Sequence, residues 1–302
     1  MTTSNEPTVS GLKIQGFSAE EDPATVEVLR YMPLVRFLYL VELAAMWFSR
    51  LGALQDKFEC TNPKGPRAFL LKMVNNPNFK NTSTPMGVSY SDLLAMTDNG
   101  NSGDVGRKMG MVNCWFMGKA ESEIMWNDYG DGGRGVAIRS TVKRLSTSFQ
   151  ITGDYAMVSR VGRVEYVDFD TFDLGCRGED MTHVPFIKAK SYAEENEVRI
   201  VTLNSIHSGT LLPDGTQPVG GVFSPEIKGL YVRCRLQELI QSIIAGPNTD
   251  WNFHMLVKRL VGRFGLTVNV ERSKLSPFAD RSPEGHEPGG QPSTPVEGSA
   301  LA

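Results

Sequence analysis

Two glutamates, Glu195 and Glu197, have the type and spacing that suit chemistry. They stand where the run Glu-Val-Arg-Ile-Val-Thr-Leu (197–203) begins, and the alternation in this run predicts a strand. Side chains two positions apart on a strand share a face, so both carboxylates are expected to point into one cleft. Paired carboxylates can stabilise a cation that forms during a reaction, or hold a metal ion. The alternatives are that both face solvent, or that Arg199 neutralises Glu197 in a structural ion pair.

Arg30 and Ser49 are the next candidates, because each falls on a short predicted strand. Arg30 lies in the strand predicted over 25–32, and Ser49 ends the one predicted over 46–49. The planar fork of a guanidinium suits a pyrophosphate or the edge of a ribose, and a serine hydroxyl can bond a ribose. The ammonium group of Lys190 can bind a phosphate as a point charge. The alternatives are a surface arginine, a serine that caps the following turn, and a solvated lysine.

Three aromatic residues are candidates for contact with a flat ligand. Tyr31 follows Arg30 directly, while Trp126 and Tyr129 are three positions apart near the helix predicted over 121–127. Either Trp126 or Tyr129 can stack on a planar ring. The alternative is that both belong to the core, because residues three apart on a helix lie on one face.

Metal chemistry has weaker signals in this sequence. The four cysteines and four histidines are scattered and include no Cys-x-x-Cys pair, so we expect no zinc site. Asp56 and Glu59 together with Glu195 and Glu197 would supply the carboxylates of a metal-dependent nuclease. A pair of loop carboxylates such as Asp56 and Glu59 is more often simply solvated.

Charge and composition limit the function classes. With 302 residues, 40% apolar and 22% charged, the chain is neither a coiled coil, nor a collagen-like fibre, nor wholly disordered. The net charge of −3 rules out a global basic excess of the kind that indicates nucleic-acid binding. Residues 1–24 and 276–302 each carry −3, which leaves +3 on the residues between them. This mildly basic body suits a phosphate-bearing ligand, unless the asymmetry is scatter in surface charge.

The ends of the chain and its most apolar stretch indicate the compartment. The N-terminus is polar and lacks the apolar run of a signal peptide. The apolar stretch 28–48 is interrupted by Arg30, Arg36 and Glu42, each of which is costly in the middle of a bilayer. Isolated cysteines suit a reducing environment. We therefore expect a cytoplasmic protein with no membrane segment.

The predicted elements alternate irregularly between strands and helices, which favours an α+β fold. We expect one domain over 25–275 with a mixed, mostly antiparallel sheet and flanking helices, a flexible segment 1–24, and a disordered, Pro- and Gly-rich tail over 276–302. Strands are predicted over 25–32, 46–49, 112–116, 134–139, 161–167, 197–203, 229–235, 242–246 and 266–270. Helices are predicted after Pro33 and over 67–74, 121–127, 185–193 and 251–265, with a long loop over 76–106.

Four segments in order resemble a bacterial family, the domain of unknown function 2971. They are Leu-Arg-Tyr-Met (29–32) with the Trp-Phe-Ser-Arg to Lys-Phe-Glu stretch (47–59), Ile-Met-Trp-Asn-Asp-Tyr to Gly-Val-Ala-Ile (124–138), Lys-Ser-Tyr-Ala-Glu-Glu-Asn-Glu-Val-Arg-Ile (190–200), and Ile-Ile-Ala-Gly-Pro (243–247). Together they span about 28–273. The family name records no activity, so the resemblance implies a shared fold and leaves function to the chemistry of the residues.

A more distant resemblance supplies a chemistry. The Glu-x-Glu turn that opens a strand is similar to that of ADP-ribosyltransferases, in which a strand glutamate holds the nicotinamide ribose of NAD while the glycosidic bond breaks through an oxocarbenium-like state. The resemblance implies Arg30, Ser49 and Glu197 as the central set, with Glu195 as a second catalytic carboxylate. Tyr31 is the alternative of a His-Tyr-Glu-like arrangement, and Trp126 or Tyr129 would stack on nicotinamide.

These resemblances imply a protein that uses NAD as a substrate and requires no metal. Its acceptor would be a protein or a nucleic acid, and its setting that of a toxin or a phage-defence effector with an antitoxin as a partner. The alternative is a regulatory module that binds a nucleotide or a nucleic acid through its basic body and does no chemistry.

Overall fold

The structure is a computed structural model. It describes residues 11–54, 107, 110–151, 159–169, 171–172, 183–203, 209–216 and 227–277. The helix predicted over 67–74, the loop predicted over 76–106, and the tail from residue 278 lie outside the described residues. No helix in these ranges is long and apolar enough to cross a membrane.

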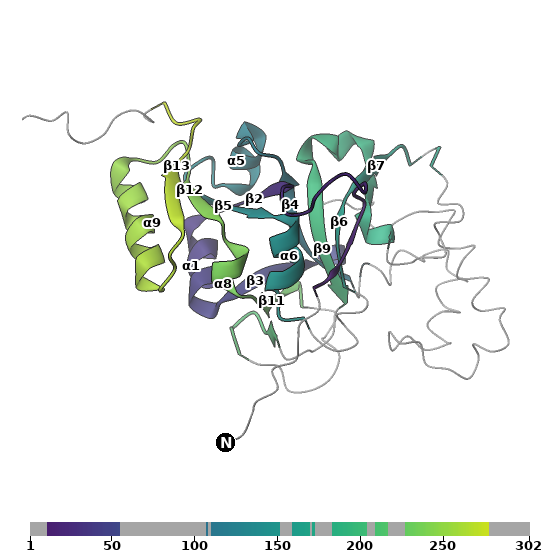
Figure 1. The fold of residues 1–302 in the computed structure, drawn as a ribbon, viewed down its shortest axis with the longest axis horizontal. Helices are drawn as coiled ribbons and strands as arrows, with labels where there is room; N and C mark the ends of the chain where they lie inside the picture. The colour runs from purple at the N-terminus through teal and green to yellow at the C-terminus, as the bar shows by residue number, and fades with distance from the viewer. Residues whose placement is uncertain are drawn as a thin grey trace, which may run out of the picture.

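One sheet of eleven strands, counted over the described ranges, organises the chain (Figure 1). Its main path runs β1-β6-β9-β4-β2-β5-β12-β13, and β3 joins β4 to a branch formed by β11 and β10. Most neighbours are antiparallel, whereas β1 with β6 and β12 with β13 are parallel. The strands are β1 (Lys13–Gln15), β2 (Glu27–Met32), β3 (Ala45–Arg50), β4 (Gly110–Met117), β5 (Val136–Thr141), β6 (Arg160–Arg163), β9 (Glu197–Leu203), β10 (Thr210–Leu211), β11 (Gly229–Arg233), β12 (Ser242–Ala245) and β13 (Asn269–Arg272). The mixed, mostly antiparallel α+β fold predicted from the sequence is confirmed.

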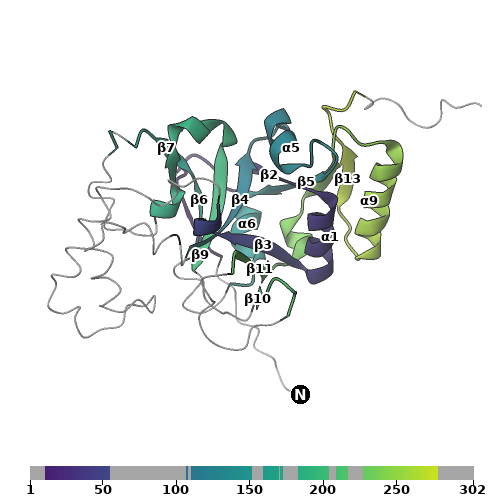
Figure 2. The same ribbon diagram turned by 180° about the vertical axis from the view of Figure 1, so that it is seen from behind.

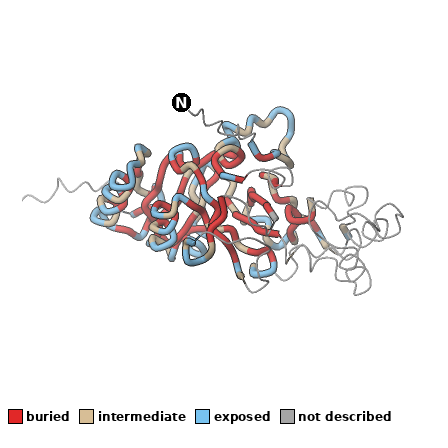
Figure 3. The backbone as a smooth tube through the Cα atoms, turned by 90° about the horizontal axis from the view of Figure 1, so that it is seen from below, coloured by how far each residue is buried: buried red, intermediate tan, exposed pale blue. Residues whose placement is uncertain are grey.

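The main core lies on one face of the sheet, beneath four helices. These are α1 (Leu34–Leu43), α6 (Val142–Ser148), α8 (Leu236–Leu239) and α9 (Trp251–Arg263). Helix α9 begins where the Asp250 carboxylate accepts the Phe253 N–H at 2.8 Å, and it buries Val257 and Val261 at helical spacing. Figures 1 and 2 both place α9 at one end of the sheet and β6 and β9 at the other. Buried backbone fills the centre of the body in Figure 3.

The opposite face of the sheet carries two smaller apolar clusters. The first surrounds Tyr31 and Trp126, under helix α5 (Glu123–Tyr129). The second surrounds Phe186, under the short parallel pair of β7 (Glu165–Val167) and β8 (Ile187–Ala189). Because neither cluster covers the whole face, a stretch of sheet between them is left for polar side chains.

Strand β4 is shared by two neighbours along the same edge, and this divides the sheet. Its C-terminal residues Phe116 and Met117 pair with β2, whereas its N-terminal residues Met111 and Val112 pair with β3. Between these pairings, β2 and β3 separate and leave the edge of residues 113–115 without a strand neighbour. We call this separation the fork.

Side chains satisfy the backbone carbonyls at the fork. The amide of Asn113 donates to the Trp47 carbonyl of β3 at 2.8 Å, and the Arg30 guanidinium donates from β2 to the Cys114 carbonyl. Buried backbone groups that lack a ladder partner need such bonds. The Arg30 side chain therefore links β2 to β4 at the point where the ladder between these strands ends.

The sequence prediction fails in the segment before β9. A helix was predicted over 185–193, but this stretch consists of the 3-10 turn η4 (Val184–Phe186), strand β8 and the 3-10 turn η5 (Lys190–Glu195). The reason is that Val184, Phe186 and Ile187 are all buried, which no single helical stripe allows. The strand predicted over 161–167 is broken into β6 and β7, and helix α6 was not predicted.

Candidate functional site

A cavity of about 700 Å³ opens on the sheet face at the fork, between the α5 cluster and the β7–β8 pair. Six of the seven residues that the sequence singled out as catalytic or cofactor-binding line this fork cavity, and Trp126 does not. The predicted residues that line it are Arg30, Tyr31, Ser49, Tyr129, Glu195 and Glu197. Residues from β2, β3, α5 and the start of β9 therefore share one space, although they are distant in the sequence.

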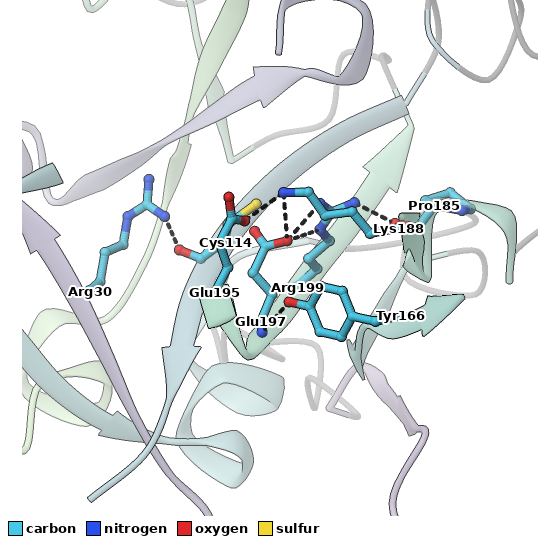
Figure 4. A network of polar contacts seen from close by, with 8 residues as sticks. All are labelled: Arg30, Cys114, Tyr166, Pro185, Lys188, Glu195, Glu197 and Arg199. Atoms are coloured by element: carbon cyan, nitrogen blue, oxygen red, sulfur yellow. Dashed lines mark hydrogen bonds and ion pairs between the residues drawn. The ribbon is translucent and has the colours of Figure 1, made fainter. Parts of the chain in front are cut away.

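Glu197 lies at the wall of the fork cavity and is almost fully buried. Its Oε2 accepts from Arg199 at 3.0 Å (Nε) and 2.7 Å (Nη2), and lies 3.5 Å from Lys188 Nζ (Figure 4). Its backbone N–H donates to the Tyr166 hydroxyl at 2.8 Å. Burial acts to raise the pKa of this carboxyl, but the charges of Arg199 and Lys188 outweigh burial and hold it below its ordinary value. Glu197 is therefore an anion at neutral pH.

Arg199 anchors this carboxylate from within the protein. Its side chain has 0% exposure, and its Nη1 donates to the Pro185 carbonyl at 2.8 Å. The ion pair between Arg199 and Glu197 that the sequence offered as an alternative to chemistry is thus present. Its presence fixes the position of Glu197, which still reaches the cavity wall.

Glu195 lies on the same wall in a different environment. Its Oε2 is 2.5 Å from Lys188 Nζ, and burial raises the pKa of this carboxyl. The environments of Glu195 and Glu197 therefore shift their pKa values in opposite directions. A pair of carboxyls separated in this way is typical of sites that need one acid and one anion.

Lys188 lies between the Glu195 and Glu197 carboxylates and contacts both. It was not predicted from the sequence as a site residue. It is 6% exposed, contacts both glutamates, and lies 4.6 Å above the ring centre of Tyr192. Lys190, the lysine predicted from the sequence to meet a phosphate, is exposed at the start of η5 and does not line the cavity. A lysine between two apolar residues in the run Ile-Lys-Ala (187–189) was the available signal, because a lone charge among buried residues needs a partner.

Arg30 and Ser49 also line the fork cavity. Arg30 is not ion-paired with any residue that the structure describes, and burial lowers the pKa of its guanidinium, which stays protonated. Ser49 Oγ accepts the Trp47 Nε1–H at 3.0 Å, which leaves the serine hydroxyl proton available to a ligand. Arg30 and Ser49 therefore add a cation and a hydroxyl donor to the lining of the cavity.

The aromatic candidates divide between wall and core. Tyr129 lines the cavity, is 47% exposed, and has its pKa raised to about 12 by burial and by the nearby charge of Glu195. Tyr31 lines the cavity too, with its hydroxyl accepting the Ser122 N–H at 2.9 Å. Trp126 is 1% exposed and packs edge-on against Tyr31, so it supports the wall and presents no stacking face.

Of the four carboxylates predicted for a metal-dependent nuclease, only Glu195 and Glu197 belong to the described residues. Asp56 and Glu59 lie outside those residues. No group of three or more potential metal ligands occurs in the described ranges. Both Glu195 and Glu197 form ion pairs with Lys188, and Glu197 also pairs with Arg199.

Comparisons with known proteins add no identity to this geometry: no family model, no curated protein sequence and no solved structure matches this chain.

Proposed function

We propose that this protein cleaves the bond between nicotinamide and ribose in NAD and transfers the ADP-ribosyl group to a macromolecular acceptor. The observation that supports the proposal is the convergence of Arg30, Ser49 and Glu197 on one cavity from β2, β3 and β9. These three strands bring a cation, a hydroxyl and an anion to the same cavity. NAD offers a diphosphate, ribose hydroxyls and a developing cation that match them in turn.

The chemistry follows from the charge that the reaction creates. When the glycosidic bond breaks, the bonding electron pair leaves with nicotinamide, which becomes neutral, and positive charge develops on the ribosyl carbon. A fixed anion stabilises that charge, and Glu197 is kept ionised and in place by Arg199 and Lys188. Both cations contact Oε2, and the Cys114 side chain also bonds this carboxylate; we assign Oε1 to the ribose hydroxyl.

Glu195 has the properties required for the second half of the reaction. An acceptor nucleophile that attacks the ribosyl carbon must lose a proton, and a carboxylate within the same wall can take it. The raised pKa of Glu195 makes it a better proton acceptor than an ordinary glutamate. Tyr129, exposed at the cavity, supplies the flat face for nicotinamide that Trp126 does not present.

The test measures nicotinamide released from NAD by the purified protein, with and without cell lysate as a source of acceptors. We expect Glu197→Gln to slow the release by about 100-fold or more, the scale on which a transition-state electrostatic contact acts. Glu194→Gln is the matched control, because Glu194 is an exposed glutamate of the same turn and does not line the cavity. A folded wild-type protein that leaves NAD intact in lysate contradicts the proposal.

A second candidate function is a nucleotide-binding module without turnover. The observation that favours it is that Glu197 is already neutralised by two cations, as in a purely structural cluster. This function predicts that NAD binds, that its affinity falls as salt rises, and that it is recovered unchanged. Release of nicotinamide that depends on Glu197 would exclude it.

A further inference from the structure

Arg36 lies outside the fork cavity but is connected to its rim. It is an exposed residue of the first turn of α1, and its guanidinium carbon lies 5.5 Å from the centre of the Trp47 ring. Trp47 in turn donates its Nε1–H to Ser49, which lines the cavity. Two contacts therefore lead from the cavity wall to a cation on the surface.

The platform under Arg36 is fixed from below. A Cβ added to Gly229 on the neighbouring strand β11 would lie 2.2 Å from Trp47 Cζ2, so the indole lies directly against the glycine backbone. Tyr231 packs edge-on against the same indole, with the ring centres 5.1 Å apart. An exposed arginine ordinarily loses much rotamer freedom when it is ordered, and here the cation–π contact with a fixed ring offsets part of that loss.

Arg30 and Arg36 also share an electrostatic feature. In the described part of the chain, a carboxylate oxygen lies within 3.8 Å of each of Arg134, Arg139, Arg163, Arg199 and Arg235. Neither Arg30 nor Arg36 is ion-paired with any residue in the described part of the chain. The charge of Arg36 acts on Arg30 and contributes to the lowering of its pKa. The two guanidiniums are thus within electrostatic reach of each other, and the Glu197 carboxylate acts on Arg30 in the opposite sense.

We propose that Arg30 and Arg36 together bind the diphosphate of a nucleotide ligand at the side of the cavity that Ser49 lines. A guanidinium presents paired N–H donors that match phosphate oxygens, and two of them match two adjacent phosphoryl groups. The identification of the ligand as a dinucleotide rests on the proposed function. The diphosphate site itself is testable without turnover.

The experiment titrates the whole protein with ADP, AMP and inorganic pyrophosphate and measures the binding heat by calorimetry. We expect the wild-type protein to bind ADP about tenfold more tightly than AMP, since one charge-assisted contact is worth about that factor. Arg36→Ala should remove this preference, and Arg36→Gln should do the same while keeping most of the side-chain volume. Trp47→Leu should weaken it by removing the platform, whereas Trp47→Phe should retain most of it.

Arg259→Ala is the matched control. Arg259 is an exposed arginine on α9, at the far end of the sheet, and it should leave all three affinities unchanged. Equal binding of ADP and AMP by the wild-type protein overturns the diphosphate site, and so does an ADP preference that survives in both Arg36 variants.

The outcomes also separate this inference from the proposed function. If the ADP preference depends on Arg36 but NAD is not cleaved, the diphosphate site stands and the chemistry fails. If NAD is cleaved and Arg36→Ala changes neither the ADP preference nor the KM for NAD, the diphosphate site fails alone.

Discussion

Replacing Glu197 by glutamine removes one negative charge from a cluster in which two buried cations depend on it. Arg199 makes two hydrogen bonds to Glu197 and has no exposed surface, and Lys188 has Glu195 as its other carboxylate partner. Breaking a buried ion pair by removing one partner costs about 3–5 kcal/mol, because the remaining charge stays buried. The glutamine oxygen can still accept one Arg199 N–H, worth about 1 kcal/mol. We therefore expect a loss of about 3 kcal/mol in the free energy of unfolding.

The assay is urea denaturation at pH 7, monitored through tryptophan fluorescence. It compares wild type, Glu197→Gln and the matched control Glu194→Gln. Glu194 is exposed, so its replacement should change the free energy of unfolding by less than about 0.5 kcal/mol. The double variant Glu197→Gln with Arg199→Met removes both charges. Its cost should be lower than the sum of the two single variants by about 2 kcal/mol.

A change below about 0.5 kcal/mol in Glu197→Gln, or strict additivity in the double variant, would refute the ion-pair cluster. The measurement also calibrates the activity experiments. A variant that loses about 3 kcal/mol remains folded if the wild type has the usual stability of about 5–15 kcal/mol. Lost turnover in a folded Glu197→Gln protein then reports on chemistry.

Three further predictions concern stability and reactivity. The folded-state pKa of Glu197 is below its ordinary value of 4.5. Its contribution to stability is therefore present above pH 4.5 and is lost as the pH falls through the folded-state pKa. The difference in the free energy of unfolding between wild type and Glu197→Gln, measured by urea denaturation, should narrow on acidification and not widen. Cys114 lines the cavity, while burial raises the pKa of Cys234 to about 12. Iodoacetamide labelling with peptide mass spectrometry should therefore modify Cys114 before Cys234, and faster labelling of Cys234 would contradict the described packing. Glu121 accepts from Ser273 at 2.5 Å, from the Lys274 N–H at 2.8 Å and from Trp126 at 2.9 Å, so Glu121→Ala should cost about 2 kcal/mol in urea denaturation, and an unchanged midpoint would refute this role.

The elements with strong local patterns were predictable from the sequence. Strand β9 begins and ends where its alternation does, and α9 follows from its apolar stripe and its Asp250 cap. Helix α6 was missed although Thr141 caps it, accepting the Arg144 N–H at 3.3 Å. Its short length gave too few repeats of the helical pattern to be recognised.

The arrangement of the site was only partly predictable. Glu195 and Glu197 line one cavity as expected, but the predicted reason was wrong: Glu195 ends the 3-10 turn η5, Asn196 is left-handed, and only Glu197 belongs to β9. Sequence spacing did not separate Trp126 from Tyr129, since residues three apart on a helix share a face and only the packing on Tyr31 shows which one is buried. Lys188 and the fork depend on contacts between segments far apart in the chain, such as the pairing of β7 with β8 and the division of β4.

The most direct test of the central claim is the rate at which the folded protein releases nicotinamide from NAD in the presence of cell lysate. We expect wild type and Glu194→Gln to release nicotinamide. At equal amounts of folded protein, we expect Glu197→Gln to release it at least about 100-fold more slowly. Release that is unaffected by Glu197→Gln, or NAD that stays intact with the wild-type protein, would contradict the claim.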